Sequence, residues 1–72
     1  MRTRILLTGA TGYVGGRLLR RLEGGDRPIR CLARRPEAVR TTRHTTEVVR
    51  GDCLDPSTLD EACADVDTAY YL

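Results

Sequence analysis

The stretch LLTGATGYVGGRLLRRL, residues 6–22, joins a short apolar run to a segment with helical periodicity, and three glycines lie in the joint. Gly9 allows a sharp turn out of a strand, because glycine adopts backbone conformations that other residues avoid. Gly12 has no side chain, so a phosphate group can approach the backbone there, and Gly15 lets the helix pack closely. The stretch predicts a strand–turn–helix unit that binds a nucleotide. The alternative is that the glycines serve only a turn and a tight crossover.

Three further residues of this turn are predicted to bind the same ligand. The N–H groups of a first helical turn and the helix dipole favour an anion. We expect the Thr11 hydroxyl to donate a hydrogen bond to a phosphate and Tyr13 to offer its backbone N–H. Val14 follows in the same turn and is included in the predicted set.

The rest of the chain alternates between strand and helix patterns. Apolar residues recur at helical spacing over residues 12–23, and Gly24-Gly25 follows as a helix stop. A second helix is predicted over residues 55–65, with Asp55 as its cap and Pro56 in its first position. Residues 34–40 predict a loop with one helical turn. Strands are predicted at residues 3–8, 28–33, 46–51 and 66–72.

This alternation is typical of a parallel sheet with helices on its faces. Right-handed crossovers leave few topologies. We therefore predict an α/β fold with strand order 3-2-1-4, the N-terminal half of a doubly wound Rossmann sheet. A fourth strand at the end of the chain would leave a sheet edge uncovered. We expect residues 1–72 to be part of a dinucleotide-binding domain, the N-terminal piece of a longer chain.

Composition narrows the class of protein. The chain has 72 residues and a net charge of +2, which is too small to indicate nucleic-acid binding. No apolar run approaches the roughly 20 residues that a membrane-spanning helix needs, and no signal peptide is recognisable, so we expect a cytoplasmic protein. Cys31, Cys53 and Cys63 lack C-x-x-C spacing and form no zinc pattern with His44. We expect reduced, partly buried thiols.

The sequence resembles the extended and atypical short-chain dehydrogenases/reductases. TGATGYVG, residues 8–15, is similar to their T-G-x-x-G-x-x-G motif. The segments CLARRPE (31–37), VVRGDCLDPSTLDEAC (48–63) and DVDTAYYL (65–72) resemble the later parts of the same half-domain. The group includes NAD-dependent epimerases/dehydratases and proteins like the nitrogen-metabolite-repression regulator. The resemblance covers the whole chain and implies a nicotinamide dinucleotide cofactor.

The end of the second strand indicates which dinucleotide is bound. NAD-binding members of this fold place an acidic residue there, where it accepts hydrogen bonds from the adenosine ribose. This chain has Arg34 and Arg35 instead. Because a guanidinium group matches a 2′-phosphate, the pair favours NADP. Two alternatives stay open: the arginines are ordinary surface residues, or the nearby Glu37 reaches the ribose and the cofactor is NAD.

The resemblance implies three further cofactor-binding residues. Asp52 matches the family aspartate that contacts the adenine amino group, and Cys53 matches the residue that lines the adenine pocket, here mainly through its backbone. Leu72 matches a position that lies along the cofactor. For Asp52 the alternative is a carboxylate that caps its own loop. Asp55 is assigned to the helix cap.

We expect none of the 72 residues of this chain to be catalytic. The family's reaction centre is a Tyr-x-x-x-Lys pair with a nearby Ser or Thr, and this chain contains no lysine. Tyr70 and Tyr71 are predicted to alternate across a strand and to serve packing. His44 is predicted to be solvent-exposed.

Three functions are compatible with this sequence. The first is an NAD(P)-dependent oxidoreductase with NADP favoured, in which this segment holds the adenosine and pyrophosphate while chemistry occurs elsewhere. The second is a non-catalytic NADP-binding sensor or regulator. The third is a sugar-nucleotide epimerase or dehydratase that retains its cofactor. The small-molecule substrate is not indicated.

Overall fold

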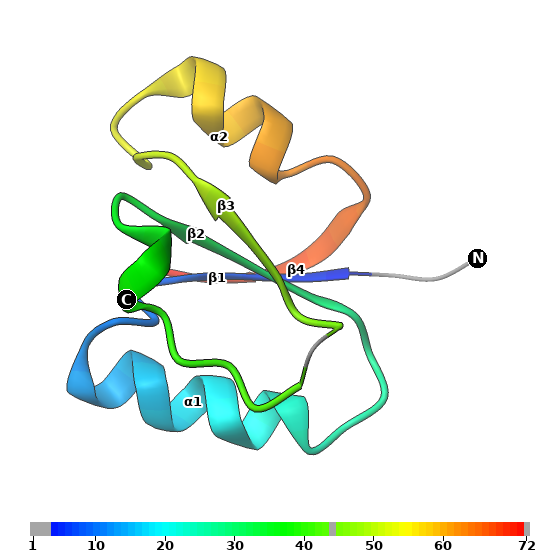
Figure 1. The fold of residues 1–72 in the computed structure, drawn as a ribbon. Helices are drawn as coiled ribbons and strands as arrows, with labels where there is room; N and C mark the ends of the chain where they lie inside the picture. The colour runs from blue at the N-terminus through cyan, green and yellow to red at the C-terminus, as the bar shows by residue number, and fades with distance from the viewer. Residues whose placement is uncertain (1–3, 44, 72) are drawn as a thin grey trace.

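The computed structural model describes residues 4–43 and 45–71. Its four strands form one parallel sheet in the order β3-β2-β1-β4 (Figure 1). This confirms the predicted order 3-2-1-4. The strands are β1 (Arg4–Thr8), β2 (Ile29–Ala33), β3 (Glu47–Arg50) and β4 (Val66–Tyr70).

The helices cover opposite faces of this sheet, α1 (Tyr13–Glu23) on one side and α2 (Pro56–Ala62) on the other (Figure 1). A short 3-10 helix, η1 (Pro36–Ala38), is the predicted helical turn after β2. Asp55 caps α2 as predicted, because its side chain accepts a hydrogen bond from the Ser57 N–H at 3.1 Å. The two faces and the short crossovers are those of a doubly wound fold.

The predicted second helix was too long, since α2 ends at Ala62 rather than at residue 65. Cys63 still has helical angles, but Asp65 has a φ of 63°, in the left-handed region that a right-handed helix excludes. The chain therefore turns before it enters β4. The predicted last strand was also too long, because β4 ends at Tyr70, and Leu72 lies outside the described residues.

Alternating strand residues build a separate core on each face of the sheet. Among the described residues, the largest fully buried side chains lie on the α1 side: Leu7, Leu19, Ile29 and Cys31. The α2 side has a smaller core of Leu6, Leu32 and Ala62.

Arg30 is a buried cation on the α2 side of β2 and ties that helix to the sheet. Its Nη1 donates to the carbonyl oxygens of Ala62 at 2.7 Å and Ala64 at 2.9 Å, and its Nε pairs with Glu47 Oε1 at 2.8 Å. A cation at a helix C-terminus satisfies carbonyl groups that lack intrahelical donors. Arg30 therefore joins β2, β3 and α2.

Glu23, at the end of α1, holds the segment that leads into β3. Its carboxylate accepts hydrogen bonds from the backbone N–H groups of Thr42 (2.9 Å) and Arg43 (3.2 Å) and from the hydroxyls of Thr42 and Thr46. Burial disfavours its charged form. The hydrogen bonds from Thr46, Thr42 and Arg43 outweigh that effect and lower the pKa of Glu23.

Tyr71 does not serve packing as predicted, since it is 71% exposed. Tyr70 is 37% exposed, so it packs only in part. His44 lies outside the described residues. Among the helices of residues 4–43 and 45–71, none is long and apolar enough to cross a membrane.

Candidate functional site

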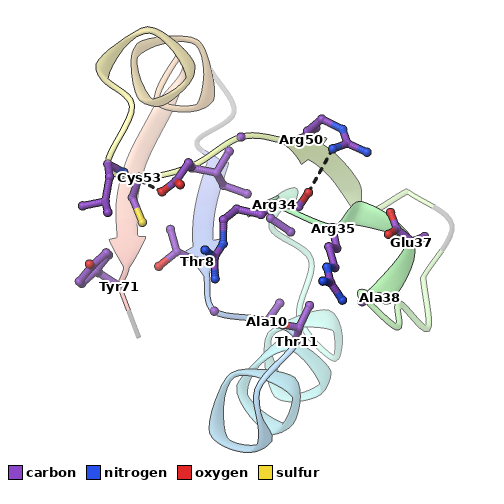
Figure 2. A pocket seen from close by; sticks show the side chains of 16 residues that line it. Thr8, Ala10, Thr11, Arg34, Arg35, Glu37, Ala38, Arg50, Cys53 and Tyr71 are labelled. Carbon is purple, nitrogen blue, oxygen red and sulfur yellow. Dashed lines mark hydrogen bonds between the residues drawn. The ribbon is translucent and has the colours of Figure 1, made fainter.

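A groove of about 960 Å³ lies at the carboxyl ends of β1, β2 and β3 (Figure 2). Ligands of open α/β sheets bind at this edge. Of the predicted cofactor-binding residues, six line the groove: Gly9, Thr11, Arg34, Arg35, Asp52 and Cys53. Gly12, Tyr13, Val14 and Gly15 do not line it and belong to the start of α1 next to it. Leu72 lies outside the described residues.

Each glycine of the turn after β1 is present for a different physical reason. Gly9 has a φ of 80°, so the predicted sharp turn is confirmed. A Cβ atom on Gly15 would lie 1.8 Å from the Gly9 carbonyl oxygen. The predicted close packing at Gly15 is thus confirmed, and its partner is the backbone of the turn itself. A Cβ on Gly12 would meet only the Gly9 oxygen at 3.6 Å, an ordinary contact.

The N-terminus of α1 has no side-chain cap among the described residues. Gly12 is the N-cap, and none of the described side chains caps the helix or places a carboxylate in its first turn. The Gly12 N–H is taken by the Gly9 carbonyl at 3.1 Å. The Tyr13 and Val14 side chains are exposed, and Tyr13 is paired with Arg17, whose guanidinium lies 5.5 Å from the ring centroid. These amides suit an anion.

Three arginines give the groove a basic side. Arg34 and Arg35 directly follow β2, and Figure 2 shows their side chains extending into the groove, Arg34 toward Thr8. Arg50, the last residue of β3, also lines the groove and donates from Nη1 to the Arg34 carbonyl oxygen at 3.3 Å. Arg50 was not among the predicted site residues, although its place at the end of a predicted strand was a usable signal. Glu37 lines the same end of the groove.

Asp52 and Cys53 form the opposite side of the groove. Asp52 Oδ1 accepts a hydrogen bond from the Leu54 N–H at 2.9 Å. This is the loop-capping role that stood as the alternative for Asp52, and it engages one oxygen. No donor among the described residues reaches Oδ2. Cys53 is half-buried against the α2-side core, and the exposed Leu54 and Tyr71 complete the lining.

Two of the three cysteines match the expectation of partly buried thiols, and the third does not. Cys31 is buried, Cys53 is half-buried and Cys63 is exposed, and all three are free. Burial, with a smaller effect from the charge of Glu23, raises the pKa of Cys31 to about 11. Cys31 is therefore a packing residue without nucleophilic character.

Comparison with known proteins agrees with this geometry. Residues 5–72 match the NAD-dependent epimerase/dehydratase family. The chain belongs to that family. Membership implies a nicotinamide dinucleotide cofactor, in line with the glycine turn at the sheet edge.

Two relatives of this family member are longer proteins. This chain is 44% identical over 68 residues to a (4-alkanoyl-5-oxo-2,5-dihydrofuran-3-yl)methyl phosphate reductase of Streptomyces griseus. The matched residues are 94% of this chain but only 24% of that protein. This chain also resembles the solved structure of the oxidoreductase ylbE from Lactococcus lactis, at 27% identity and a TM-score of 0.85, covering 97% of the chain and 32% of that protein.

Proposed function

We propose that this chain is the adenosine- and pyrophosphate-binding segment of an NADP-dependent oxidoreductase of the short-chain dehydrogenase/reductase type. The observation that carries the proposal is the convergence of the glycine turn after β1 and the arginines after β2 on one groove. The proposal also includes a longer parent protein, a cytoplasmic location and a small-molecule substrate. These three points rest on the sequence.

The pyrophosphate is assigned to the turn between β1 and α1. Neither packing nor backbone conformation accounts for glycine at position 12, where a Cβ would have ordinary room and φ is −81°. Close approach of a ligand does account for it. The amides of Tyr13, Val14 and Gly15 then face an anion, and the Thr11 hydroxyl lies at the groove.

The 2′-phosphate of the adenosine ribose is assigned to Arg34 and Arg35. Three cations and two carboxylates line the groove, which leaves it a net positive charge. A 2′-phosphate adds about two negative charges and oxygens that suit bidentate guanidinium contacts. Glu37 is the carboxylate that would instead favour the free 2′-hydroxyl of NAD, and it lines the same groove as Arg35 and Arg50.

The adenine is assigned to the side of the groove formed by Asp52 and Cys53. Asp52 Oδ2 would accept from the adenine amino group, and Cys53 would line the pocket. Leu72 is assigned to the same cofactor from the sequence. A bound nicotinamide dinucleotide supplies or accepts a hydride. These residues bind and orient its adenosine half, and the groups that act on substrate belong to the rest of the protein.

A titration of the full-length protein with NADPH and NADH tests the proposal. Arg34→Ala should weaken NADPH binding by about 10- to 100-fold, the loss expected for hydrogen bonds to a charged group, and should leave NADH binding unchanged. Arg20→Ala is the matched control, because Arg20 is an exposed arginine on α1 away from the groove. Equal binding of both dinucleotides would overturn the choice of NADP. Absence of binding would overturn the function.

A sugar-nucleotide epimerase or dehydratase is the second candidate, favoured by the description of the matching family. Such an enzyme regenerates its cofactor within each turnover, whereas a reductase releases the oxidised form. Stoichiometric consumption of NADPH with product formation would favour the reductase. A cofactor that remains bound through purification and turnover would favour the epimerase. Binding without turnover would favour a sensor.

A further inference from the structure

Thr58, in the first turn of α2, contacts the backbone of Asp52 through a single hydroxyl group. Its Oγ1 accepts a hydrogen bond from the Asp52 N–H at 3.1 Å. The same oxygen lies 2.9 Å from the Asp52 carbonyl oxygen and 3.0 Å from that of Asp55, so its proton has an acceptor in either direction. One side chain thereby lies within hydrogen-bond distance of both backbone polar groups of Asp52.

The contact depends on a close approach between α2 and the loop after β3. A Cβ on Gly51 would lie 2.9 Å from the Thr58 Cβ and 2.5 Å from Leu32 Cδ1. Both distances are shorter than side-chain packing allows, so glycine at position 51 brings Thr58 within reach of Asp52. Neither Gly51 nor Thr58 was among the residues predicted to form the site.

The remaining freedom of Asp52 is removed by its own loop. Asp52 Oδ1 accepts from the Leu54 N–H at 2.9 Å, and the Asp52 carbonyl accepts from the Asp55 N–H at 2.8 Å. With the backbone held by Thr58 and Oδ1 held by Leu54, the direction of Oδ2 at the groove is set before any ligand arrives. Preorganised acceptors lose less free energy on binding than mobile ones.

We propose that Thr58 is a positioning residue for base recognition: its hydroxyl fixes Asp52 so that the carboxylate reads the amino group of adenine. Thr58 itself touches no part of the ligand. The inference rests on the proposed function, in which Asp52 is the adenine acceptor. It adds that the preference for adenine over other purines depends on a residue in α2.

The test compares reduced NADP with its hypoxanthine analogue, in which an oxygen replaces the adenine amino group. Binding of both is measured to the full-length wild type and to Thr58→Val, which keeps the shape of the side chain and removes the hydroxyl. We expect the wild type to prefer adenine by about tenfold or more, as for a hydrogen bond to a charged group. We expect Thr58→Val to lose most of that preference while it still binds NADPH more tightly than NADH, because the arginines lie on the other side of the groove.

Two further variants separate positioning from general loss of structure. Ser57→Ala also removes a hydroxyl from the first turn of α2, one that donates to Asp55 Oδ1 at 2.8 Å and does not touch Asp52. It should keep the adenine preference. Thr58→Ser retains the hydroxyl and should keep the preference as well, which gives a readout even if Thr58→Val folds poorly.

The outcomes also distinguish this inference from the proposed function. An unchanged adenine preference in Thr58→Val, or its loss in Thr58→Ser, would overturn the role of Thr58 alone. A wild type that binds both analogues equally would overturn the role of Asp52 and with it that of Thr58, while dinucleotide binding stands. A wild type that binds neither would overturn the proposed function itself.

Discussion

Gly15 and Gly16 are adjacent in sequence but differ in what a side chain at each would meet. A Cβ at Gly15 would sit 1.8 Å from the Gly9 carbonyl oxygen, a rigid backbone atom. A Cβ at Gly16 would sit 3.4 Å from the Ala10 carbonyl oxygen, an ordinary contact. The turn that precedes α1 therefore depends on the first glycine and not on the second.

Gly15→Ala should accordingly destabilise the full-length protein by about 1–3 kcal/mol and greatly weaken NADPH binding, because the turn must move to admit the methyl group. Gly16→Ala should be tolerated or stabilising by up to about 1 kcal/mol, since alanine favours a helix. Denaturant unfolding and NADPH titration of both variants measure these effects. Similar behaviour of the two variants would contradict this account of the turn.

At the scale of the elements, Arg30 is the main polar link between the sheet and α2. Arg4 also reaches Glu47, with its Nη1 3.4 Å from Oε1, but it is more exposed than Arg30 and, among the described residues, forms no hydrogen bond or ion pair with α2. The two arginines share one carboxylate, so they allow a comparison of a buried cation with a surface ion pair.

Arg30→Met should lower the free energy of unfolding by about 2–3 kcal/mol, because the carbonyl groups at the end of α2 lose a charged donor. Arg4→Met should cost less than about 1 kcal/mol, as surface ion pairs do. Denaturant unfolding monitored by circular dichroism gives both values. An equal cost for the two substitutions would argue against Arg30 as the tie to α2.

A second link between elements depends on pH. The pKa of Glu23 lies below its ordinary value of 4.5, so the folded state binds this proton less tightly than the unfolded state does. The stabilising contribution of Glu23 is therefore complete above pH 4.5 and is lost as the pH falls through the folded-state pKa. Glu23→Gln should show a weaker loss of stability in this acidic range than the wild type, measured by thermal unfolding at several pH values.

At the scale of the whole molecule, local signals in the sequence predicted the sheet. The period of each segment, the glycines after β1 and the Asp55-Pro56 start of α2 led to the strand order and to most of the groove. The larger missed features are contacts between residues far apart in sequence: Arg30 lies 32 residues from Ala62, and Glu23 lies 23 residues from Thr46. Such pairs are set by the packing of finished elements, which no local pattern records. The end of α2 was mispredicted for another reason. The helical pattern continues to residue 65, but Asp65 has a left-handed φ of 63°.

The three cysteines differ in burial, so their alkylation rates should report on different properties of the molecule. A thiol-specific alkylating reagent at mildly alkaline pH should modify the exposed Cys63 first, and the half-buried Cys53 more slowly. NADPH bound in the groove should shield Cys53 and leave the rate at Cys63 unchanged. Cys31 combines complete burial with a pKa of about 11, so it should react only when the sheet opens. Mass spectrometry of one time course would therefore record surface exposure, ligand occupancy and unfolding at three separate sites in the same chain.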